Sequence, residues 1–118
     1  MEFEVVTREI LHGGAIRRPI RWRRDVAGGP DRLAWYDIAP GEQCTAHWHT
    51  GKAEAWLVVA GRGRVEIGAD VFEAEAGDAF VTEPGLAHAI WNTGDTTFTF
   101  VNIVRWTGGP VTTVEVDR

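Results

Sequence analysis

Short alternating segments separated by glycine and proline turns set the strongest limit on the fold of this chain. Turn signals such as Pro40-Gly41, Gly77-Asp78 and Pro84-Gly85 recur about every 8–12 residues. No apolar repeat of helical period lies between them. Strand-length segments at this spacing are typical of an all-β sandwich or barrel. The sequence therefore predicts strands and turns with almost no helix.

The expected strands are placed by the turns that bound them. They are residues 2–7, 32–38, 43–49, 54–60, 64–67, 71–76, 79–83, 88–92, 96–106 and 111–116. Residues 8–31 are irregular and include a basic patch at 16–24. Because Ile20 and Trp22 alternate with arginines there, part of the patch is expected to pair as a strand.

The length of the chain predicts one domain. A chain of 118 residues is large enough to bury one modest core, and no internal boundary is visible. We expect residues 1–118 to form a single domain with its core at about 31–106. The N-terminal arm would span 1–30, and the last strand 111–116.

Composition and charge exclude several classes of function. The net charge of −5 and the pI of about 5.3 argue against a nucleic-acid partner. No apolar run approaches the roughly 20 residues that a membrane span needs. The first ten residues carry acids where a signal peptide would be basic, and the lone Cys44 has no partner for an internal disulfide. These features predict a cytoplasmic chain without a nucleic-acid or membrane partner.

Two histidines and a glutamate form the most informative pattern. His47 and His49 alternate around Trp48, so both imidazoles face the same side of a strand. Glu54 follows a short polar break at 50–52. The next strand is expected to run back beside the first as a hairpin, which would bring Glu54 level with the histidines. Two imidazoles and a carboxylate on neighbouring strands suit a divalent transition metal.

A second stretch, residues 77–92, supplies another candidate ligand. His88 lies just after the Pro84-Gly85 turn, and we propose it as the fourth ligand.

These spaced residues resemble the two motifs of the cupins, small jelly-roll β-barrels that hold a metal inside. The first cupin motif is Gly, five residues, His-x-His, four residues, Glu, six residues, Gly. It is filled without a gap by Gly41, His47, His49, Glu54 and Gly61. The resemblance implies a jelly-roll, or double-stranded β-helix, cupin barrel.

The second cupin motif is Gly, five residues, Pro-x-Gly, two residues, His, three residues, Asn. It is matched by Gly77, Gly85, His88 and Asn92. The chain departs from it at Glu83, where the family usually has Pro; Pro84 comes one place later. The motif therefore does not determine the shape of this turn, but it does determine the position of His88.

Each candidate ligand also has a structural alternative. Any one histidine could be an ordinary core or surface residue, but three of the four in the chain fall at motif positions. Glu54 either ligates the metal or stands off it as a catalytic base, and a nearby cation would remove the cost of burying its charge in both cases. Cys44 is expected to face away from the ligands and belong to the core. His12 is expected to be solvated.

The ligand set implies one divalent transition metal per chain, with Fe(II) favoured and Mn, Ni, Zn, Co or Cu as alternatives. Three imidazoles and one carboxylate leave open positions on a six-coordinate ion. We therefore expect a metal-dependent enzyme, first a dioxygenase-type oxidoreductase for a small chelating organic substrate. The alternatives are a non-redox isomerase, cyclase, lyase or decarboxylase, and a small-molecule-binding cupin without turnover.

Aromatic residues suggest a pocket wall and an interface. If Glu54 points inward, so does Trp56, which is predicted to bind substrate beside the metal unless it only packs in the core. Trp48 and Trp91 are expected outside the cavity. Together with edge strands at 2–7 and 111–116 that could pair across subunits, they predict a homodimer.

The basic patch allows three interpretations. It contains Arg17, Arg18, Arg21, Arg23 and Arg24. The favoured interpretation is a solvated segment. The alternatives are a salt-bridge network with a partner subunit and a lid that attracts a carboxylate substrate.

Overall fold

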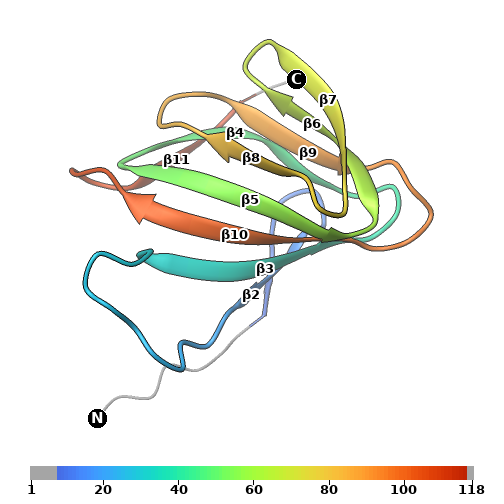
Figure 1. Ribbon diagram of the computed structural model, residues 1–118. Coiled ribbons are helices and arrows are strands. Elements are labelled where there is room, and N and C mark those ends of the chain that lie inside the picture. Colours follow the sequence, from blue (N-terminus) through green and yellow to red (C-terminus); the bar gives the residue numbers. More distant parts are fainter. Residues whose placement is uncertain (1–7, 117–118) are drawn as a thin grey trace.

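The structure, a computed structural model that describes residues 8–116, consists of two facing antiparallel β-sheets (Figure 1). The six-stranded sheet has the order β1 (Glu9–Ile10), β2 (Ile16–Pro19), β3 (Arg32–Ile38), β10 (Phe98–Trp106), β5 (Lys52–Ala60) and β8 (Ala79–Thr82). The five-stranded sheet has the order β11 (Thr112–Glu115), β4 (Gln43–Thr50), β9 (His88–Asn92), β6 (Arg62–Ile67) and β7 (Asp70–Glu75). The predicted all-β jelly-roll architecture is confirmed.

The strands lie close to where the turn signals placed them. The spans predicted at 32–38 and 88–92 match β3 and β9 residue for residue, and the other predicted spans after residue 31 differ from the observed strands by at most two residues at an end. The predicted strand at 2–7 lies outside the described residues. Part of the basic patch does form a strand, since β2 pairs antiparallel with β3, but Ile20 and Trp22, whose alternation suggested it, lie beyond the end of β2. The described residues include no helix that is long and apolar enough to cross a membrane.

Strict alternation along β10 fills the space between the sheets. Phe98, Phe100, Asn102 and Val104 are buried, while the residues between them are partly exposed. The sequence left open which face of this strand is inside, and the structure places the Phe98 face inward. Burial of this apolar face supplies much of the driving force for closing the sheets. Asn102 is the polar exception, and its place in the core matters for the site.

The expected hairpin between β4 and β5 does not form. β4 pairs with β9 and β11, whereas β5 pairs with β8 and β10 in the other sheet. The chain crosses between sheets at Gly51, whose φ of 75° is a left-handed conformation that favours glycine. A Cβ at this position would lie 2.6 Å from the carbonyl oxygen of Pro110, so the turn also has no room for a side chain. Glu54 therefore reaches the histidines across the interior of the barrel, not from a neighbouring strand.

Candidate metal centre

Three histidines from two adjacent strands meet inside the barrel. His47 and His49 lie on β4, and His88 on β9 is the register partner of His47. One ligand nitrogen from each residue lies within 4.8 Å of those from the other two. The ring centroids of His47 and His88 are 4.4 Å apart, and those of His47 and His49 are 4.6 Å apart. The sequence prediction that these imidazoles converge is confirmed.

The Nδ1 atom of each imidazole contacts an oxygen atom of a neighbouring residue. His47 Nδ1 is 2.6 Å from the carbonyl oxygen of Thr45, and His88 Nδ1 is 3.3 Å from that of Leu86. A carbonyl oxygen only accepts, so Nδ1 carries the proton in both rings and Nε2 keeps its lone pair. His49 Nδ1 is 2.9 Å from the Thr113 hydroxyl on β11. Outer contacts of this kind orient imidazoles for ligation through Nε2.

Burial keeps the imidazoles of His47 and His88 neutral. It lowers the pKa of His88 to about 4, with a further contribution from the charge of His47. Burial also lowers the pKa of His47, although its hydrogen bond to the Thr45 carbonyl opposes this effect. Since a metal binds the neutral ring, both residues are in the form that ligates at neutral pH.

Glu54 faces the histidine cluster from the opposite sheet. Its Oε1 lies 3.1 Å from Nε2 of His49, out of line for a hydrogen bond, and 3.8 Å from Nζ of Lys52. Its Oε2 accepts a 2.6 Å hydrogen bond from Nδ2 of Asn102. Burial alone would raise the pKa of this carboxyl, but the interaction with His49 and the Lys52 charge lower it to about 2. Glu54 is therefore an ionised carboxylate with one oxygen held and the other turned toward the rings.

The described residues fit a divalent metal. Within residues 8–116, His88 Nε2 and Glu54 Oε1 are buried without a hydrogen-bond partner. Buried polar atoms are rarely left unpaired, so two such atoms facing one cluster point to a cation between them. Neutral imidazoles and an ionised carboxylate are also the donor types that transition metals take.

Trp56 lies behind the cluster. Its ring centroid is 6.0 Å from that of His88, and its Nε1 donates a 3.0 Å hydrogen bond to Thr82 Oγ1. It is 2% exposed and packs edge-on against Tyr36 and Phe100. The inward orientation predicted from the strand alternation is thus confirmed, and contact with substrate stays a prediction.

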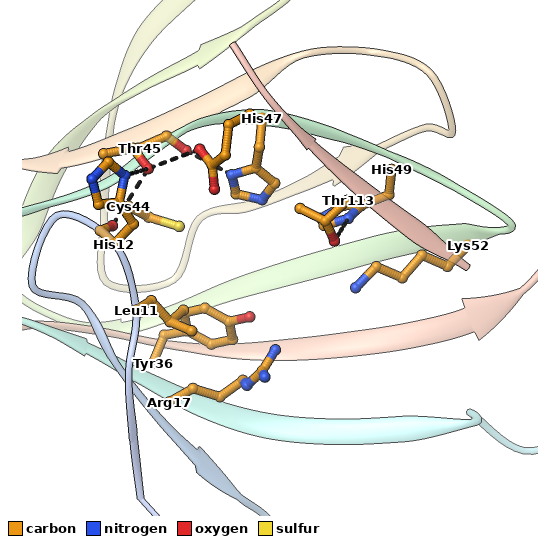
Figure 2. Close-up of a pocket in the computed structure, with 11 residues that line it drawn as sticks. Leu11, His12, Arg17, Tyr36, Cys44, Thr45, His47, His49, Lys52 and Thr113 are labelled. Atoms are coloured by element: carbon orange, nitrogen blue, oxygen red, sulfur yellow. Dashed lines mark hydrogen bonds between the residues drawn. The ribbon is translucent and has the colours of Figure 1, made fainter. Parts of the chain in front are cut away.

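A cavity of about 190 Å³ opens beside His47 and His49 (Figure 2). Its lining residues are Leu11, His12, Arg17, Tyr36, Cys44, Thr45, His47, His49, Lys52, Thr113 and Glu115. His12 is exposed as expected, and it also lies at this cavity with Nδ1 3.1 Å from Thr45 Oγ1.

Cys44 corrects a sequence expectation. The alternation from His47 predicted that it faces away from the ligands, but it lines the same cavity. β4 has a bulge between Cys44 and His47, which adds one residue against β9 and reverses the alternation. The expectation that Cys44 is buried in the core is correct, and burial raises the pKa of its thiol to about 12. It is therefore a protonated wall residue.

The basic patch divides into residues with different environments. Arg21, Arg23 and Arg24 are exposed, as expected for a solvated segment. Arg18 pairs with Asp37 at 2.8 Å. Arg17 departs from the favoured interpretation, since it lines the cavity.

Sequence reasoning missed three further polar residues near the site. Lys52 lies two positions before Glu54 on β5, and this parity was a usable signal that both point inward. Asn102 and Tyr36 had no such signal, because the inner faces of β10 and β3 depend on how the sheets pack.

Two facing sheets with a histidine cluster between them define a class of metal-binding β-barrel. The family model described as the cupin domain matches residues 34–104. The chain therefore belongs to the cupin family.

The individual relatives are distant. The chain is 30% identical over 67 residues to an oxalate-binding protein of Thermotoga maritima, covering 57% of this chain and 55% of that protein. It is also 30% identical over 66 residues to a mannose-1-phosphate guanylyltransferase of Salmonella typhimurium, covering 56% of this chain and 14% of that enzyme. The chain thus spans about half or less of these curated relatives.

Solved structures confirm the fold. A predicted oxalate decarboxylase from Thermotoga maritima superposes with a TM-score of 0.73 at 22% identity, covering 86% of this chain and 93% of that one. A putative sugar phosphate isomerase from Acidithiobacillus ferrooxidans gives 0.71 at 21% identity, covering 93% and 72%. At such identities the likeness shows the shared barrel and not the reaction.

Proposed function

We propose that this cupin is a metal-dependent enzyme for a small chelating organic molecule, with a dioxygenase-type oxidation as the first reaction to test. The observation that supports it is the set of three converging imidazoles and one ionised carboxylate that face one another beside a cavity. His47, His49, His88 and Glu54 would hold one divalent ion, with Fe(II) as the first metal to test. Such an ion supplies Lewis-acid and redox chemistry at the coordination positions that the protein leaves open.

The chain's own residues prepare the site. Thr45, Leu86 and Thr113 hold the three rings through Nδ1. Asn102 holds one oxygen of Glu54 and so orients the other. This preorganisation supports a site that binds metal without large rearrangement.

Glu54 has two candidate roles, ligand and base. A base works best when its pKa lies near the working pH. The pKa of about 2 for Glu54 therefore favours the ligand role, because the carboxylate is ionised but accepts a proton weakly. We keep the base role as the alternative and separate the two by mutation in the Discussion.

Oxygen consumption tests the proposal. Protein purified without chelators would be analysed for metal, reloaded with Fe(II), and assayed for oxygen uptake with enols, diketones and catechols. Substrate-dependent uptake that stops in His49→Ala supports an oxygenase. Fully metal-loaded protein that consumes no oxygen with any of these substrates would contradict it.

Metal-dependent decarboxylation is a second candidate. It is supported by similarity to proteins whose names refer to oxalate binding or decarboxylation. Release of carbon dioxide from oxalate by Mn(II)- or Fe(II)-loaded protein, without matching oxygen uptake, would favour it over oxidation.

Association of two chains is a further proposal. Trp48 and Trp91 are only partly exposed, and Trp91 packs 5.5 Å from the Arg64 guanidinium. The outer face of the six-stranded sheet carries more exposed apolar side chains, including Leu57 at 40% and Val81 at 59%. β11, expected to pair across subunits, pairs with β4 of its own chain. Sedimentation at micromolar concentration distinguishes a dimer from a 13.0 kDa monomer.

A further inference from the structure

We propose that the cavity wall formed by Arg17 and Lys52 is an anion subsite that binds a carboxylate of the substrate. The inference rests on the proposed function, in which the other end of the substrate chelates the metal. The substrate class is then a short chelating organic acid that carries an additional carboxylate.

Lys52 supplies a buried positive charge to the cavity. It is 7% exposed and lines the cavity, and among the described residues its ion pair is with Glu54 at 3.8 Å, beyond hydrogen-bond distance. A buried ammonium carries three N–H donors and is costly unless they are paired. Its donors are therefore available to an anion that enters the cavity.

Arg17 supplies the second charge from the N-terminal arm. Its side chain is 21% exposed, and its Nε and Nη2 donate to Glu9 at 3.1 and 2.6 Å. A guanidinium has five N–H donors, so further donors remain. Its planar fork suits a carboxylate better than any other side chain does. Arg17 lies outside residues 34–104, so the charge is added by a segment beyond the matched cupin domain.

The two cations and the histidines lie around the same cavity. Figure 2 shows Arg17 and Tyr36 across the cavity from His47, with the amino group of Lys52 extending from the His49 side toward Arg17. The acid among the lining residues, Glu115, lies on β11, where it is the register partner of His47 and accepts a hydrogen bond from Thr45 Oγ1. Arg17 and Lys52 therefore make one wall of the cavity cationic, and the cavity volume of about 190 Å³ admits only a compact ligand.

A purely structural explanation exists for each cation alone. In this explanation the role of Lys52 is to neutralise Glu54, and the role of Arg17 is to pair with Glu9. These roles predict effects on stability but no preference between ligands of different charge. A comparison of two ligands therefore separates recognition from structural neutralisation.

Lactate and malate form a suitable pair of probes. Both carry the same chelating 2-hydroxycarboxylate, and malate adds one carboxylate. Calorimetric titration of Ni(II)-loaded protein should give malate about a tenfold advantage over lactate, as expected for a charge-assisted contact. Arg17→Gln should remove most of this preference, while lactate affinity and Ni(II) content stay unchanged. Lys52→Met should reduce the preference as well, and it is compared with wild type at equal Ni(II) loading because Lys52 also pairs with Glu54.

Arg18→Gln is the matched control, since it removes the same charge from the next residue of β2. Arg18 pairs with Asp37 and is not among the residues lining the cavity, so this variant should keep the preference for malate. Equal affinity of the wild-type protein for the two acids, or an unchanged preference in Arg17→Gln, would overturn the inference.

Failure of the metal proposal is recognised separately. If wild-type protein binds no Ni(II), the metal centre is wrong, and the subsite is then tested in metal-free protein through the NMR signal of the Arg17 Nε–H. A shift with malate that lactate does not produce supports the subsite. No shift with either acid rules it out.

Discussion

His88 offers a direct test of how burial tunes the centre. Its pKa falls from 6.5 to about 4 in the folded protein, because burial disfavours the charged ring and His47 lies beside it. Below pH 6.5 the unfolded chain binds a proton at His88 that the folded chain rejects. The free energy of unfolding of the metal-free protein should therefore decrease as the pH falls from 6.5 to 4.

The size of this decrease follows from the shift in pKa. Each pKa unit corresponds to about 1.4 kcal/mol, so the complete shift of His88 contributes roughly 3 kcal/mol to the free energy of unfolding. About 2 kcal/mol of this should be lost between pH 7 and pH 5. This range lies above the window of Glu54, whose contribution is lost only as the pH falls from 4.5 toward 2. The lowered pKa of His47 acts in the same direction as that of His88.

Urea unfolding with a chelator at pH 7, 6 and 5 measures the effect. His88→Gln replaces the titrating ring with a side chain of similar size that does not titrate. The free energy of unfolding of this variant should therefore decrease between pH 7 and pH 5 by about 2 kcal/mol less than that of wild type. His12→Gln, which removes an exposed imidazole, is measured alongside as the control for the loss of a histidine. If His88→Gln and wild type show equal pH dependence, the conclusion that His88 is held neutral by burial is wrong.

Three further predictions concern the ligands and their support. His49→Ala should lose both metal and turnover, and Glu54→Gln should also lose metal together with turnover if Glu54 is a ligand, as its low pKa favours. Metal content and activity are measured on the same preparations; retained metal with lost turnover in Glu54→Gln would instead indicate the base role, and full activity would exclude it. Asn102→Leu should destabilise the protein by roughly 1–3 kcal/mol in urea unfolding, because one buried oxygen of Glu54 then has no hydrogen-bond donor. An equal loss of stability in a Glu54→Gln background would contradict this coupling between Asn102 and Glu54. Metal at about 100 times its Kd should stabilise the fold by about 2.7 kcal/mol, and a melting temperature equal to that with chelator would disprove a folded-state site.

The candidate metal ligands could be proposed from the sequence because their signal is local. His47 and His49 share a face through strand alternation alone. His88 and Glu54 were placed by their spacing from glycine and proline turns, which is also written in the sequence. The same turns predicted most strand ends, since glycine and proline commonly interrupt strands. Gly63 is an exception because it lies inside β6, which therefore begins two residues before the predicted strand.

Other features depended on long-range packing. The bulge in β4 turned Cys44 into the cavity, and the crossing at Gly51 placed Glu54 in the opposite sheet. Neither event changes the local pattern, so the sequence predicted the wrong face for Cys44 and the wrong strand pairing for β5.

The sequence by itself determined the strands, the turns and the residue types that can hold a metal. Only the tertiary structure decided which polar groups of other strands surround them. Arg17 and Asn102 come from two different strands, and they reach the cavity and Glu54 because two sheets close over one core. Contacts of this kind depend on how whole strands pair and face each other, which no short window of sequence encodes.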